Sequence, residues 1–223
     1  MSVQIAFSNG FGLLAPEVEA EIRAGIDEGI AALEAHVPVA PIAIAVHQHA
    51  NTSRFTGTGG RSYGPDSCVM WVDDANPVLG SDTRRKLARL TVHEVHHCLR
   101  QRHFWPRRWQ EWAGGEVLVL EGLATQCEAW LGYGEPLIVT GHDSARTRDL
   151  LDRLAPDIAA TPPEDGNPVW QWLYELNGYP EQVYRAVYPM GHLLVGRYLE
   201  RTEHTPISAL SVPWREIWET GRM

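Results

Sequence analysis

Cysteine is scarce in this 223-residue sequence. Its three cysteines, Cys68, Cys98 and Cys127, are an odd number, lie far apart and include no C-x-x-C pair. The sequence therefore indicates no disulfide framework, and we expect reduced thiols and a cytoplasmic location.

Long apolar runs are also absent. No stretch of eighteen consecutive apolar residues occurs, and the first residues, M-S-V-Q-I-A-F-S, lack the basic region and the apolar core of a signal peptide. We therefore expect a chain that is neither exported nor inserted in a membrane.

Positive charge is sparse as well. The sequence has 19 basic and 28 acidic residues, a formal net charge of −9, and no long basic run. Binding to a phosphate backbone depends on clustered basic side chains, so nucleic acid is not an expected partner. With 44% hydrophobic and 21% charged residues, the composition is that of an ordinary globular protein with one sizeable core.

The first third of the chain contains one helical and two strand-like patterns. Apolar residues from Val18 to Leu33 recur at spacings of three and four, whereas Ile42 and Ile44 alternate with small residues. The segment 51–64 is rich in glycine and hydroxyl residues. From these patterns we expect a helix over 15–35, a strand within 41–49, a loop over 51–64, and a strand over 68–72 in a hairpin with an exposed edge.

The remaining chain is dominated by helical patterns. We expect a helix over about 82–103 that ends before Trp105 and Pro106, and a second over about 116–132. Residues 134–168 look loop-rich, with one or two helical turns over 149–154. A last helical stripe runs over 184–198, where Pro189 either kinks the helix or starts its second half.

The pattern H-E-x-x-H occurs within the 82–103 helix as His93, Glu94 and His97. Because four residues make just over one helical turn, the two imidazoles project from one face about 6 Å apart and can bind one Zn²⁺. Glu94 is displaced by roughly 100° and can reach a metal-bound water without being a ligand. Leu87 and Leu90 extend the same side of the helix, so the motif is expected to point inward. Burial of these polar groups is costly, and a metal ion removes that cost.

A tetrahedral zinc site with two histidines needs a third protein ligand and an open water position. Glu121, in L-E-G-L-A, follows His97 by twenty-four residues on the second of two helices that we expect to be antiparallel. Glu128 lies two turns further along the same face. We expect Glu121 to be the ligand and Glu128 to accept a hydrogen bond from a ligand histidine, although either glutamate can instead lie on a solvated face.

Three segments together resemble a known family. T-V-H-E-V-H-H-C-L-R, E-G-L-A and Y-P-M-G-H-L-L-V-G-R-Y-L, over roughly residues 50–202, are similar to predicted zinc-dependent proteases of the gluzincin type that carry a domain-of-unknown-function label. The first fifty residues match less clearly. The resemblance implies that His93, His97 and Glu121 bind zinc and that Glu94 is the general base.

The same resemblance implies an α+β, zincin-like fold. In such a fold a small mixed sheet has an edge strand over an active-site helix, and a mostly helical lobe follows. We therefore expect a single catalytic domain over 1–223, with an α/β lobe over 1–103 and a helical lobe over 104–223.

The mechanism expected of such an enzyme gives further residues a role. Zinc activates a water, and Glu94 accepts its proton and passes it to the leaving amine. Tyr188 and His192, four residues apart on the last helix, are candidate donors to the oxyanion, although tyrosines on an apolar stripe are more often core. The 68–72 strand, with Val69 and Trp71, can align a peptide by main-chain hydrogen bonds, and Gly60 permits its close approach, unless that glycine only makes a turn.

The sequence thus predicts a cytoplasmic zinc metallopeptidase with Zn²⁺ as its cofactor and a peptide or an unstructured protein as its substrate. Two alternatives stay open. One is a non-catalytic, zinc-stabilised protein that binds a peptide, and the other is a zinc hydrolase of a non-peptide amide or ester.

Overall fold

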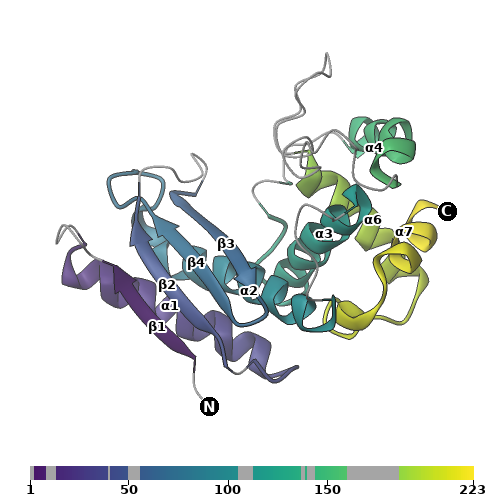
Figure 1. Ribbon diagram of the computed structural model, residues 1–223. Coiled ribbons are helices and arrows are strands. Elements are labelled where there is room, and N and C mark those ends of the chain that lie inside the picture. Colours follow the sequence, from purple (N-terminus) through teal and green to yellow (C-terminus); the bar gives the residue numbers. More distant parts are fainter. Residues whose placement is uncertain are drawn as a thin grey trace. The chain divides into compact units, whose positions relative to one another are not determined.

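The structure is a computed structural model, shown in Figure 1, and it describes residues 3–8, 14–39, 41–49, 56–104, 113–136, 139, 144–159 and 186–223. These residues contain helices and a four-stranded sheet, so the predicted α+β class is confirmed. Chain contacts define two compact units, Met1–Trp105 with Leu131–Gly134, and Pro106–Trp130 with Glu135–Met223. Among the described helices, none combines the length and the apolar character needed to cross a membrane.

The first unit contains a mixed sheet. Its strands are β1 (Gln4–Ser8), β2 (Ala43–Gln48), β3 (Thr58–Gly64) and β4 (Ser67–Val72), in the order β1-β2-β4-β3. β1, β2 and β4 are parallel, whereas β3 pairs antiparallel with β4. Ile44 pairs with Cys68 and Val46 with Met70, and all four side chains are buried on one face because successive residues alternate between the two faces.

β3 occupies residues for which the sequence predicts a loop. The prediction is wrong for 58–64, and residues 51–55 lie outside the described part of the chain. Glycine and hydroxyl residues have little intrinsic preference for strands, but pairing with β4 supplies the main-chain hydrogen bonds that this segment needs. β1 was also not predicted from the sequence.

Two helices cover one face of this sheet, as Figure 1 shows: α1 (Pro16–Glu34) and α2 (Thr83–Phe104). Both helices were predicted from their apolar periodicity. Gly25 and Gly29 allow α1 to lie against the backbone of α2, since a Cβ at either position would lie 2.4 Å from a carbonyl oxygen of α2. The close contact fixes α2 within the first unit.

The second unit is helical. It contains α3 (Gly114–Trp130), α4 (Ser144–Ala159), α6 (Val187–Arg201) and α7 (Trp214–Arg222), and short 3₁₀ turns occur at Gly80–Asp82 in the first unit and Ser208–Ser211 in the second. Leucine, isoleucine and valine side chains from these helices form one core. α4 extends well beyond the one or two turns predicted over 149–154. Pro189 is the third residue of α6 and lies in its first turn, where a missing N–H breaks no helical hydrogen bond. Trp105, Pro106 and Tyr184 lie outside the described residues.

Candidate metal centre

Two histidine rings from α2 lie side by side. The ring centroids of His93 and His97 are 4.5 Å apart and the ring planes form an angle of 83°. Both side chains are buried, with exposed fractions of 8% and 5%. The spacing of four residues on a regular helix therefore brings both imidazoles to one face, as the sequence predicted.

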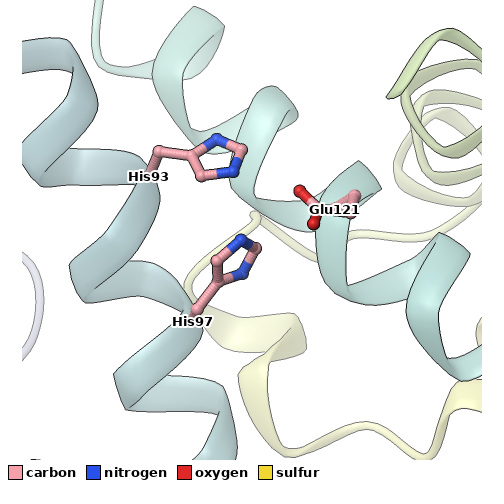
Figure 2. A group of neighbouring side chains, drawn as sticks. All are labelled: His93, His97 and Glu121. Carbon is pink, nitrogen blue, oxygen red and sulfur yellow. The ribbon is translucent and has the colours of Figure 1, made fainter. Parts of the chain in front are cut away.

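A carboxylate from α3 completes a group of three. Glu121 is buried, and the metal-binding atoms that His93, His97 and Glu121 offer all lie within 4.8 Å of one another. Figure 2 shows both rings and the carboxylate directed toward a common point. Two imidazoles and one carboxylate are a donor set that Zn²⁺ accepts, with a fourth position left for water. The chemistry of the three side chains thus fits a zinc ion.

Glu94 lies on a different side of α2 from the two histidines. It belongs to a stripe that faces the sheet and is formed by Thr91, Glu94, Cys98 and Gln101, at spacings of three and four residues. The side chain is buried with an exposed fraction of 4%. The nearest part of the sheet is Gly60 of β3, where an added Cβ would lie 2.6 Å from both Cγ and Oε1 of Glu94.

Polar contacts on either side of Glu94 fix α2 on the sheet. Thr91 Oγ1 lies 3.9 Å from Met70 Sδ on β4, and Gln101 Nε2 donates a hydrogen bond of 2.9 Å to Ser62 Oγ on β3. The Thr91 hydroxyl also donates to the Leu87 carbonyl oxygen within the helix, at 2.7 Å. Sequence reasoning missed these contacts, although the spacing of Gln101 seven residues after Glu94 already places both on one helical face.

Most of the chain matches one known protein family. The sequence model of a family described as "Predicted Zn-dependent protease (DUF2268)" matches residues 22–219. The chain belongs to this family. The match confirms the resemblance and extends it toward the N-terminus, over most of α1. Neither the comparison with curated proteins nor the comparison with solved structures finds a match.

Within the second unit, helices α3 and α6 are in direct backbone contact at two glycines. A Cβ on Gly122 of α3 would lie 2.3 Å from the Gly191 carbonyl oxygen of α6, and a Cβ on Gly191 would lie 2.4 Å from the Leu118 carbonyl oxygen. Only glycine permits two helix backbones to approach this closely. Gly122 follows Glu121 and Gly191 precedes His192, so the contact fixes the helical turns that carry these two side chains.

His192 is partly buried beside α3. Gln126 Nε2 of α3 donates a hydrogen bond of 2.8 Å to the His192 carbonyl oxygen, and the ring atom Nδ1 has no hydrogen-bond partner among the described residues. Burial lowers the pKa of His192 below its ordinary value, while the carboxylates of Glu135 and Glu128 act in the opposite direction. At neutral pH the ring is therefore neutral and carries one N–H donor. The predicted role as an oxyanion donor stays a prediction.

Tyr188 and Glu128 have positions that leave their predicted roles open. Tyr188 is partly buried and packs against the core of the second unit, as tyrosines on an apolar helical stripe often do. Glu128 is buried on α3, close enough to Cys127 and His192 to act on the pKa of each. Its hydrogen bond to a ligand histidine stays a prediction.

The three cysteines are buried and free. The pKa of the Cys68 thiol is raised mainly by a hydrogen bond with Cys98 and, to a smaller extent, by burial. The pKa of the Cys127 thiol is raised mainly by burial and, to a smaller extent, by the charge of Glu128. Both thiols are therefore protonated at neutral pH, a state in which cysteine is neither a strong nucleophile nor a ready metal ligand.

The prediction that the 68–72 strand offers a free edge is wrong. β4 pairs with β2 on one side and with β3 on the other, so its main chain has no free edge for a peptide. The edge position belongs to β3 instead. Val69 and Trp71 alternate with the buried Cys68, Met70 and Val72, so their side chains point to the face opposite α2 and Glu94.

Proposed function

We propose that this protein is a zinc-dependent metallopeptidase of the gluzincin type with a zincin-like fold, in which His93, His97 and Glu121 hold the metal. The observation that carries the proposal is the buried group of two imidazoles and one carboxylate with ligand atoms within 4.8 Å of one another. The family description, which names a zinc-dependent protease, supports the same reading. A zinc ion held by these residues supplies a Lewis acid that polarises the scissile carbonyl and lowers the pKa of water.

Glu94 is the proposed general base. Its carboxylate takes a proton from the attacking water and returns it to the nitrogen of the leaving amine, so the water oxygen bonds to the carbonyl carbon as the C–N bond breaks. Two features support the role. Glu94 is adjacent to His93 in the chain, and its side chain is buried against the sheet rather than extended into solvent, so the carboxylate has few alternative positions.

His192 is the proposed donor to the developing oxyanion. Its neutral ring at physiological pH provides an N–H, and the buried Nδ1 atom has no hydrogen-bond partner among the described residues. The Gly122–Gly191 contact supports the assignment, because it ties the turn that carries His192 to the turn that carries Glu121. Tyr188 is the second candidate, one turn before His192 on the same helix.

The proposed substrate is a peptide bond in a short or unstructured peptide. The test is incubation of the zinc-loaded protein with a diverse peptide library, with and without a chelator, followed by mass spectrometry. Cleavage that the chelator abolishes and added zinc restores supports the proposal. Zinc and peptide binding without cleavage identifies a zinc-stabilised binding protein instead. An intact library together with turnover of small amide or ester substrates identifies a non-peptide hydrolase.

A further inference from the structure

Gly60 on the edge strand β3 lies directly opposite Glu94. An added Cβ at this position would lie 2.6 Å from Cγ, 2.6 Å from Oε1 and 2.7 Å from Cδ of Glu94. Non-bonded heavy atoms do not approach this closely without one of them moving. The Glu94 side chain therefore fits beside β3 only because residue 60 is a glycine and has no side chain.

The helix cannot easily move away to make room. On one side of Glu94, Thr91 packs on Met70, and on the other side Gln101 donates its hydrogen bond to Ser62. Gly25 and Gly29 of α1 also lie against the backbone of α2. The part that can respond to a methyl group at position 60 is thus the Glu94 side chain, which has three rotatable bonds.

The neighbouring glycine offers a matched comparison. Gly59 points to the opposite face of the sheet, where an added Cβ would meet only Trp71 Cε3 at 3.5 Å, an ordinary contact. Neither Gly59 nor Gly60 has the positive φ that disfavours other residues. Alanine at either position therefore keeps the backbone conformation, and the two substitutions differ mainly in whether the new methyl group meets Glu94.

We propose that Gly60 is a positioning residue for Glu94: the missing side chain on β3 creates the space in which the sheet holds the Glu94 carboxylate. The inference rests on the proposed function, in which Glu94 moves the proton, and it gives Gly60 a different task from the peptide approach that the sequence suggested. Gly60 acts through Glu94 and binds neither the metal nor the substrate.

This assignment predicts which kinetic constant changes. Displacement of a proton-transfer group by about 1 Å can lower a rate about 100-fold, whereas ground-state binding of the substrate does not involve that group. Gly60→Ala is therefore expected to lower kcat by about 10- to 100-fold with KM and zinc content unchanged. Gly59→Ala is expected to keep kcat within about twofold of the unaltered protein, because its methyl group does not reach Glu94.

The experiment compares the unaltered protein, Gly60→Ala and Gly59→Ala as purified, zinc-loaded chains. Peptide hydrolysis gives kcat and KM, and elemental analysis gives the zinc content. A loss of kcat confined to Gly60→Ala supports the proposal. An unchanged kcat in Gly60→Ala, or the same loss in both variants, overturns it, since the effect then does not depend on the methyl group that meets Glu94.

A second measurement separates this inference from the proposed function. Gly60→Ala is made in the unaltered protein and in a Glu94→Ala background, and Tm is measured for all four proteins. A contact between the two positions predicts that Gly60→Ala lowers Tm, or prevents folding, only when Glu94 is present. An equal effect in both backgrounds, or no effect in either, overturns the inference. If the unaltered protein hydrolyses no peptide, the proposed function fails, and the Tm comparison alone decides whether Gly60 positions Glu94.

Discussion

Gly122 of α3 and Gly191 of α6 are in backbone contact, since a Cβ on Gly122 would lie 2.3 Å from the Gly191 carbonyl oxygen. The turn that carries Glu121 and the turn that carries His192 are therefore held together without any side chain between them. This contact gives a physical reason for the glycines in the segments E-G-L-A and Y-P-M-G-H.

Gly122→Ala is expected to destabilise the second unit. Its methyl group would meet main-chain atoms of α6, which cannot rotate away, so we expect a loss of about 1–3 kcal/mol in the free energy of unfolding. Gly59→Ala is the control, because its Cβ would meet only Trp71 Cε3 at 3.5 Å, an ordinary contact. Urea unfolding measures both variants. Equal stability of Gly122→Ala and the unaltered protein would show that the helices do not pack this closely.

Glu94→Gln is expected to keep zinc and lose turnover. Glutamine has nearly the same shape as glutamate but cannot accept a proton at neutral pH, and proton transfer by a positioned side chain contributes about 10²- to 10⁴-fold to a rate. We expect a loss of that size in kcat, with about one zinc per chain. The assay is peptide hydrolysis alongside elemental analysis. Full activity in this variant would remove Glu94 from the mechanism.

Glu121→Ala and Glu128→Ala separate a metal ligand from a supporting residue. Loss of an outer partner of a ligand typically weakens metal binding about 10- to 100-fold, so loss of the ligand itself is expected to weaken it by more than about 100-fold. Competition with a chromogenic chelator measures both affinities. Unchanged affinity in Glu121→Ala together with a large loss in Glu128→Ala would reverse the assignment.

His192 predicts a pH dependence of stability. Burial lowers its pKa in the folded state below 6.5, so the unfolded state binds a proton more readily. The contribution of a neutral His192 is fully present above pH 6.5 and is lost as the pH falls toward the lowered pKa of the folded state. His192→Gln lacks this titration, so its stability is expected to fall less than that of the unaltered protein as the pH falls from 7 to below 6.5. Parallel pH dependence in urea unfolding of the two proteins would contradict the prediction.

The sequence predicted the elements that have strong periodicity or a defined metal motif. α1 and α2 follow from their apolar spacing, and the H-E-x-x-H pattern places His93 and His97 on one helical face. Both the family resemblance and its position in the sequence favoured Glu121 over Glu128 as the third metal ligand. In the structure, Glu121 is the glutamate that lies with His93 and His97.

The elements that were missed depend on long-range contacts. β3 has the composition of a loop and becomes a strand only through pairing with β4. α4 was predicted too short, although Leu151, Leu154 and Ile158 keep a helical spacing and are buried in the core. The helix continues through Pro156. The contact between Gly60 and Glu94 joins residues more than thirty positions apart, and a single sequence carries no signal for such a pair.

The most direct test of the central claim is the zinc content of the unaltered protein and of His97→Ala after both are supplied with zinc and freed of unbound metal by gel filtration. Three converging ligands predict about one zinc per chain in the unaltered protein and almost none in His97→Ala. An unaltered protein that retains no zinc, or a His97→Ala variant that retains as much as the unaltered protein, would contradict the account.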